Sequence, residues 1–332
     1  MTKSNLKTLV RPPYRPGAAS KFHEVPFDTH DAREAAAKLP NKERQRLVEF
    51  LLHRYPTFDT GWNMLRDCHL PVDEGSPGAG VFGGLYGDTR TGKSAICKAY
   101  IAEHQSYVAE DGEVYPIVYI EAKASFTPST LTDQFFLKTG ARAQATRVAQ
   151  TTRDMKAIDR LIRHRTEMVI IDDAQYLLFD RRRDEVPKFN SFIRSLIEAK
   201  SFAVLLVGEP KVRNWVLDLP DLSGRNYFEE EIEHFDRSPE GQENFQLLMG
   251  GIDDLLPFAE PSGLGEPDIA GEMYEYSDGF LGRAMNLIRR ASWTSMNEGH
   301  RRIKRETLAD WSRRMQWKTK NVRPYFQFGG AL

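Results

Sequence analysis

A phosphate-loop pattern constrains the fold of this chain more than any other feature. The segment Gly87-Asp88-Thr89-Arg90-Thr91-Gly92-Lys93-Ser94 fits the pattern Gly-x-x-x-x-Gly-Lys-Ser in full. An apolar run precedes it at residues 81–86, and a helical pattern follows at 93–104. Glycines let backbone N–H groups curl around phosphate oxygens, which are also stabilised by the positive end of the following helix. The pattern therefore predicts a strand, a tight turn and a helix in that order, and not merely a structural turn.

Each polar residue of this loop has an expected role. Lys93 is expected to reach the β- and γ-phosphates of a nucleotide, and the Ser94 hydroxyl is expected to ligate Mg²⁺. The predicted nucleotide-binding residues are Gly87, Asp88, Thr89, Arg90, Thr91, Gly92, Lys93 and Ser94.

A pair of carboxylates follows a second apolar run. Residues 168–171 are apolar, and Asp172 and Asp173 come directly after them. The carboxyl ends of parallel strands are where open α/β sheets bind ligands. Asp172 is then expected to hold Mg²⁺ through water, and Asp173 to orient or deprotonate the attacking water. An acidic pair at this place can also be a helix cap. The Asn-Lys-x-Asp motif of GTPases is missing from the sequence, which favours ATP as the nucleotide.

The order of apolar and helical patterns predicts an α/β fold. Short apolar runs alternate with helical segments, which is typical of a parallel sheet covered on both faces. The expected strands are 81–86, 115–121, 168–171 and 202–207, and the expected helices between and after them are 93–104, 128–138, 153–164 and 188–199.

Four regions are expected along the chain. Residues 1–75 form an N-terminal arm and helical region, with helices expected at 30–37, 41–53 and 56–67. Residues 76–236 form the nucleotide-binding core, 237–318 a helical lid, and 319–332 a C-terminal tail.

The near-zero net charge conceals strong patterning. The 332 residues include 46 basic and 47 acidic ones, for a net charge of −1. Residues 139–165 carry seven basic and two acidic residues. Residues 218–278 carry two basic and 17 acidic residues, and 281–320 carry eleven basic and three acidic residues. Such asymmetry indicates either a polyanion-binding face opposite an acidic one or ordinary solvated helix faces.

Composition excludes several other classes. Cys68 and Cys97 are the two cysteines of the sequence, too few for a disulfide framework or a cysteine-based zinc site. No apolar run approaches the roughly 20 residues of a membrane helix. The expected location is cytoplasmic, and no membrane partner is expected.

Further motifs carry a resemblance to a known family. They are Ile170-Ile171-Asp172-Asp173-Ala174-Gln175-Tyr176-Leu177, Leu206-Val207-Gly208-Glu209-Pro210 and Gly279-Phe280-Leu281-Gly282-Arg283. Together with the phosphate loop, they make residues 76–316 resemble AAA+ ATPases. Within that superfamily the chain looks most like the TnsC/TniB family of transposition regulators, which is related to MuB.

The resemblance implies a fold and further site residues. It implies a three-layer αβα core with a parallel sheet ordered 5-1-4-3-2, a small helical lid, and ATP bound between neighbouring protomers. Arg225 would be the catalytic arginine finger beside Asp173 and Lys93, and Arg283 would be a second sensor of the nucleotide. The family usually has Glu at the position of Asp173, and a small polar sensor at the position of Glu209.

The resemblance also implies partners. Family members assemble on double-stranded DNA without sequence specificity, as hexameric or heptameric rings or as helical filaments. They recruit a transposase and respond to a target-selection protein or an RNA-guided complex. In this sequence the candidate DNA contacts are Lys123 and Thr127, with Arg142 and Arg147 adding reach. The run 181–183 could contact DNA or pair with the acidic block of a neighbouring protomer.

The implied function is ATP-dependent regulation of DNA transposition, with slow ATP hydrolysis as a timing switch. Two alternatives stay open at this stage. One is a scaffold that binds ATP with little turnover, and the other is a helicase loader.

Overall fold

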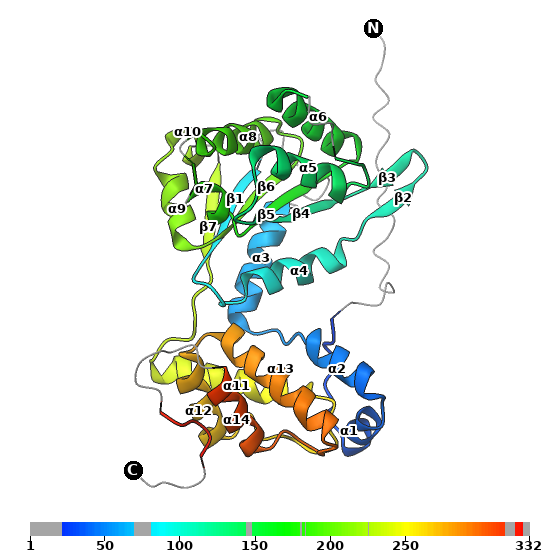
Figure 1. Cartoon of the computed structure of the whole chain (residues 1–332), viewed down its shortest axis with the longest axis vertical. Helices are drawn as coiled ribbons and strands as arrows, with labels where there is room; N and C mark the ends of the chain where they lie inside the picture. The colour runs from blue at the N-terminus through cyan, green and yellow to red at the C-terminus, as the bar shows by residue number, and fades with distance from the viewer. Residues whose placement is uncertain are drawn as a thin grey trace.

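The computed structural model describes residues 22–69, 81–143, 148–179, 181–182, 184–224, 226–315 and 323–327. A five-stranded parallel sheet lies at the centre of the upper part of the molecule in Figure 1. Its order is β4-β5-β6-β1-β7. When only these five strands are numbered along the chain, β7 is the fifth and β4 the second, and the order read from β7 is 5-1-4-3-2, which confirms the prediction. The strands are β4 (Ile117–Glu121), β5 (Met168–Asp172), β6 (Ala203–Gly208), β1 (Val81–Tyr86) and β7 (Tyr227–Glu231).

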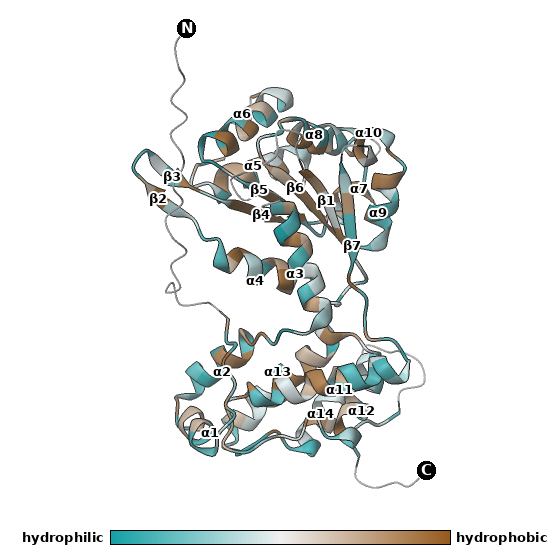
Figure 2. Cartoon of the chain, turned by 180° about the vertical axis from the view of Figure 1, so that it is seen from behind, coloured by the Kyte–Doolittle hydropathy of each residue, from teal (hydrophilic) through white to brown (hydrophobic). Residues whose placement is uncertain are grey.

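Helices cover both faces of this sheet, which confirms the predicted three-layer αβα architecture. Every residue of β1, β5 and β6 is buried, and these strands are among the most hydrophobic segments in Figure 2. One face carries α3 (Pro56–His69) and α4 (Lys93–Glu103). The opposite face carries α5 (Pro128–Lys138), α6 (Gln150–Arg163), α7 (Gln175–Leu178), α8 (Val186–Glu198), α9 (Pro210–Leu217) and α10 (Pro220–Ser223).

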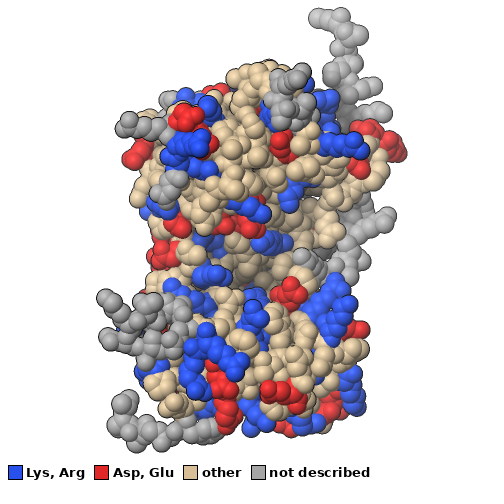
Figure 3. Space-filling view, in the orientation of Figure 1, with Lys and Arg blue, Asp and Glu red and all other residues tan. Residues whose placement is uncertain are grey.

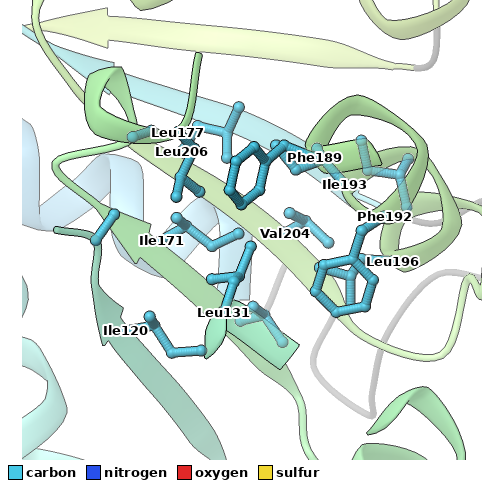
Figure 4. Close-up of a cluster of buried hydrophobic side chains, with 14 of the residues drawn as sticks. Ile120, Leu131, Ile171, Leu177, Phe189, Phe192, Ile193, Leu196, Val204 and Leu206 are labelled. Atoms are coloured by element: carbon cyan, nitrogen blue, oxygen red, sulfur yellow. The ribbon is translucent and has the colours of Figure 1, made fainter. Parts of the chain in front are cut away.

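The larger core forms between the sheet and α8. Figure 4 shows Ile171, Val204 and Leu206 of the sheet beneath the side chains of α8. The α8 residues in this core are Phe189, Phe192, Ile193 and Leu196, at the spacing of one helix face. Alternate residues of the same strands point to the other face, where Ile170 and Leu205 pack with α3 and α4.

Three strands, β7 and the two of a hairpin, were not expected from the sequence. The edge strand β7 contains Glu229, Glu230 and Glu231, and this run of carboxylates hid it from a search for apolar strands. Charged residues are common on edge strands because they discourage pairing with other chains. A hairpin of β2 (Tyr107–Ala109) and β3 (Gly112–Val114) lies between α4 and β4 and projects from the body of the molecule.

The C-terminal helices form a separate core, which we call the lid. They are α11 (Pro239–Asp254), α12 (Pro267–Ser277), α13 (Leu281–Asn297) and α14 (Arg305–Arg314). None of the helices in the ranges that the structure describes is long and apolar enough to cross a membrane.

The first two helices, α1 (His30–Ala37) and α2 (Asn41–Glu49), pack on this lid. Arg44 donates from Nε to the carbonyl of Pro257 at 2.9 Å, and Asn41 donates to the carbonyl of Met296 at 3.2 Å. Val48 is fully buried in the lid core. The helical region expected within residues 1–75 therefore contributes to two cores, since α3 packs on the sheet.

Replacing Val48 tests whether α2 belongs to the lid core. Val48→Ala should lower the free energy of unfolding by about 2 kcal/mol, because it removes two buried methyl groups and leaves a cavity. Val25→Ala is the control, since Val25 is 71% exposed and should have no measurable effect. Equilibrium denaturation by urea measures both. Equal stability of the two variants would show that α2 does not stabilise the lid.

Candidate functional site

The turn between β1 and α4 has the backbone that the phosphate-loop pattern predicts. Gly87 has φ +147°, and a Cβ there would lie 2.1 Å from the carbonyl oxygen of Ile232. Gly92, at the start of α4, has φ +108°. Side chains are disfavoured in this left-handed region and cannot fit against backbone at 2.1 Å. The two glycines therefore shape the loop whose N–H groups can surround a phosphate.

Lys93 lies inside this loop. Its Nζ donates to the carbonyls of Gly87 at 2.8 Å and Asp88 at 2.7 Å. Burial lowers the pKa of Lys93, and the nearby carboxylates of Asp172 and Asp173 oppose that shift. The ammonium group is thus held where phosphates would lie against the loop.

The two carboxylates after β5 have different surroundings. Asp172 is 1% exposed and accepts hydrogen bonds from the Tyr119 hydroxyl at 2.6 Å and the Asp173 N–H at 2.8 Å. These bonds fix the carboxylate, as outer-shell partners fix metal ligands. Ser94 lines the cleft beside the loop. A serine hydroxyl and a carboxylate are the hard oxygen donors that Mg²⁺ prefers, so Ser94 and Asp172 fit the predicted metal roles.

Asp173 faces the cleft in a strained conformation. Its φ is +55°, which is uncommon for a residue other than glycine. Burial raises the pKa of Asp173, and the neighbouring charge of Asp172 raises it further. Backbone strain at such a position is often part of a functional site.

Gln175 is a site residue to which sequence reasoning assigned no role. Its Nε2 donates to Asp173 Oδ1 at 3.0 Å, and its Oε1 accepts from the Glu209 N–H at 3.3 Å. The side chain therefore connects the end of β5 with the end of β6. Glu209, at the expected sensor position, forms an ion pair with Lys211 at 2.9 Å. The sequence signal that could have revealed the role of Gln175 is its position in the motif at residues 170–177, directly after the acidic pair.

The lid contacts the phosphate loop directly. The N–H of Gly282 donates to the carbonyl of Arg90 at 2.9 Å. Arg283, the next residue, donates to the Ser277 carbonyl at 3.1 Å and lies 4.0 Å from the ring centroid of Phe280. Burial lowers the pKa of Arg283, the charge of Asp278 opposes that shift, and Arg90 and Asp88 of the loop act more weakly in opposite directions. The expected sensor is thus close to the loop.

A cleft of about 1260 Å³ separates the core from the lid, and Figure 3 shows it as a hollow with lysine and arginine side chains at its walls. Predicted site residues of the core line this cleft, together with Gly282 of the lid, whereas Arg283 is not part of its lining. Its lining includes Thr89, Arg90, Gly92, Lys93, Ser94, Asp173, Gln175, Glu209 and Gly282.

A smaller pocket of about 180 Å³ adjoins the loop. Arg90, Gly92 and Gly282 line both the pocket and the cleft. Its other walls come from the segment between α2 and α3 and from two lid helices, and they are mostly apolar. They include Leu51, Leu52, Tyr55, Leu248, Ile252 and Met285. An apolar pocket next to a phosphate loop has the character of a site for a flat aromatic base.

Comparison with known families supports this interpretation of the core. Residues 79–216 match the model of a family described as an AAA domain. Over these residues the chain is similar to AAA domains. None of the curated proteins matches the chain in sequence. The narrower resemblance to TnsC/TniB is not confirmed by these comparisons.

Several solved structures share the fold over most of this chain. The Orc1 protein of Aeropyrum pernix in complex with DNA covers 78% of this chain and 64% of its own, with a TM-score of 0.55 and 18% identity. The Orc2 protein of the same organism, in ADPNP–ADP complexes, covers 77% of this chain and 66% of its own, with a TM-score of 0.54 and 15% identity. Cdc6p of Pyrobaculum aerophilum covers 80% of this chain and 69% of its own, with a TM-score of 0.59 and 15% identity. At such identities the likeness shows the fold alone, and the chain spans less than two thirds of both Orc proteins.

The predicted DNA contacts occupy different ends of one helix of the AAA domain. Lys123 and Thr127 lie at the start of α5, where Lys123 is exposed and Thr127 forms a capping box with Thr130. Arg142 is exposed beyond the other end of α5, whose 11 residues span about 16 Å. Arg181 donates to the Lys123 carbonyl at 3.2 Å. Arg147 and Arg225 lie outside the described residues.

Replacing Gly282 tests the contact between lid and loop. A Cβ at Gly282 would lie 2.8 Å from the Arg90 carbonyl oxygen and would push α13 away from the loop. Gly282→Ala should weaken ATP binding about tenfold, as expected for an overpacked contact. Titration with a fluorescent ATP analogue measures this affinity.

Gly271→Ala is the matched control within the lid. No atom lies within 4 Å of a Cβ at Gly271 in α12, so its ATP affinity should be unchanged. An equal loss in both variants, or none in Gly282→Ala, would contradict a role for the contact in nucleotide binding.

Proposed function

We propose that this protein is an ATP-dependent, DNA-binding AAA+ regulator of DNA transposition. It oligomerises on target DNA, recruits or activates a transposase, and uses ATP hydrolysis as a timing switch. The observation that carries the ATP-dependent part is the convergence of Lys93, Ser94 and Asp173 on one cleft beneath the lid. The transposition part rests on the resemblance of the four motifs to the TnsC/TniB family.

The chain offers a group for each part of ATP binding. The loop N–H groups and Lys93 hold the phosphates, and the small apolar pocket takes the adenine. Ser94 and Asp172 hold Mg²⁺, which when bound neutralises phosphate charge. Asp173, oriented by Gln175, positions or deprotonates the attacking water. Arg283 senses the nucleotide from the lid.

Arg225 supplies the arginine finger from a neighbouring protomer in this proposal. An arginine finger raises hydrolysis by about 10³–10⁵, so turnover would depend on assembly. Lys123 and Thr127 bind the DNA backbone, with Arg142 and Arg147 adding reach. Backbone contacts carry no base information, which suits non-specific binding.

A helicase loader is the second candidate. It is favoured by the similar fold of the Orc and Cdc6 proteins, one of which is described in complex with DNA. A scaffold with little turnover is the third, because Asp173 is one methylene shorter than the glutamate usual in the family.

Two substitutions separate ATP binding from hydrolysis. Lys93→Ala should abolish ATP binding and assembly, because it removes the ammonium group from the loop. Asp173→Asn should bind ATP and stay assembled but lose hydrolysis by about 10²-fold or more. Phosphate release with and without duplex DNA, and electron microscopy with a non-hydrolysable ATP analogue, measure both effects.

The wild type should form rings or filaments only with both nucleotide and duplex DNA. A monomer indifferent to both would refute the regulator, and rings without DNA dependence would favour the scaffold.

Arg225→Ala should bind ATP yet lose turnover. Normal turnover in that variant would refute the finger role.

Replacing Lys123 tests the DNA surface. The logarithm of DNA affinity falls linearly with the logarithm of salt concentration. Lys123→Ala should make this negative slope shallower by about 1, because one phosphate contact is lost. Lys188→Ala is the control, since this exposed lysine of α8 forms an ion pair with Asp184 at 3.1 Å. Fluorescence anisotropy with unrelated duplex sequences measures both slopes. Identical slopes in Lys123→Ala and the wild type would contradict the assignment.

A further inference from the structure

Arg289 lies on the face of α13 that lines the nucleotide cleft. It follows Gly282 by seven residues, which places the two on the same side of the helix about two turns apart. Both residues line the cleft and the small apolar pocket. The neighbouring Arg290 points elsewhere, with its guanidinium carbon 5.4 Å from the Trp293 ring and 5.7 Å from the Trp311 ring.

The Arg289 guanidinium contains a buried donor without a partner. Its Nε–H is inaccessible to solvent and makes no hydrogen bond within the part of the chain that the structure describes. Its Nη1 makes one long contact of 3.5 Å, to Asn286 Oδ1. Burial lowers the pKa of Arg289, opposed by the charge of Glu49 at the end of α2. The Nε–H therefore faces protein and not the pocket. The side chain as a whole is only partly buried and lines the pocket, so an acceptor placed there meets the terminal N–H groups of the guanidinium.

The chemistry of the pocket restricts what this acceptor can be. A guanidinium has five N–H donors and no acceptor, so its partner must present a lone pair. Most of the remaining walls, such as Tyr55, Ile252 and Met285, are apolar and suit a flat ring. The polar residues of the lining besides Arg289 are His53, Arg90 and Asn286. The phosphate-binding groups belong to the loop, with Lys93 absent from the pocket lining. A ring nitrogen of a purine meets both requirements.

We propose that Arg289 determines the affinity for the purine base by donating a hydrogen bond to one of its ring nitrogens. This inference rests on the proposed ATP binding and adds a base-reading residue to it. A base contact is common to ATP and ADP, whereas a phosphate contact distinguishes them. Arg289 should therefore act equally on both nucleotides and not at all on inorganic triphosphate.

The test is a titration of the full chain with ATP, ADP and inorganic triphosphate in the presence of Mg²⁺. Arg289→Met should weaken ATP and ADP by the same factor, about tenfold or more, and leave triphosphate binding unchanged. Arg290→Met is the matched control and should bind all three like the wild type. Thermal unfolding checks that both variants fold. If Arg289→Met does not fold, Arg289→Lys keeps the charge without the planar donors and should show the same equal weakening.

Three outcomes would overturn the inference. They are unchanged ATP and ADP affinity in Arg289→Met, weakening of ATP alone, or an equal weakening of inorganic triphosphate, which would assign Arg289 to the phosphates. Failure of the proposed ATP binding is recognised separately. In that case wild type does not bind ATP, or Lys93→Ala binds it as well as wild type does, and both proposals fall together.

Discussion

The hydrogen bond from the Gly282 N–H to the Arg90 carbonyl joins the two parts of the nucleotide site. The phosphate loop alone can surround phosphates, but it has no walls for a base and no residue that reports on the nucleotide. This contact sets the first turn of α13 against the loop, since only glycine can approach Arg90 so closely. Gly282 and Arg289 then line the site from the same helix.

The lid is not an independent C-terminal appendage, because α2 contributes Val48 to its core and Arg33 of α1 forms an ion pair with Asp254 of α11. The chain leaves α2, crosses to the sheet as the segment before α3, and lines the apolar pocket on its way through Leu51 and Tyr55. It returns to the lid only after β7. Two connections therefore join core and lid, and one of them is a wall of the pocket. A ligand in the pocket would therefore contact the connection between α2 and α3 as well as the lid helices.

Most of the fold and the phosphate site could be predicted from local patterns. The phosphate loop is continuous in sequence, and β1, β5 and β6 are apolar throughout because both faces are buried. The remainder depends on contacts between distant residues. Gln175 acquires its role only because β5 and β6 end side by side, and Arg289 only because α13 faces α4. Gln175 stands in one of the quoted motifs, but the motif does not show its contacts, and Arg289 stands in no motif at all. The carboxylate-rich β7 was missed because an edge strand need not be apolar.

The structure also changes the meaning of the charge blocks. Many carboxylates of residues 218–278 have partners within the chain. Asp254 pairs with Arg33 of α1, Asp278 with Arg237, and Glu260 with Arg301. Asp253, buried in the lid, accepts the N–H groups of Ser262 and Gly263. The more exposed of these pairs contribute only about 0–1 kcal/mol each, but they neutralise part of the acidic surface. Part of the acidic block is thus paired within the chain, with α1 through Arg33 and with the 281–320 block through Arg301.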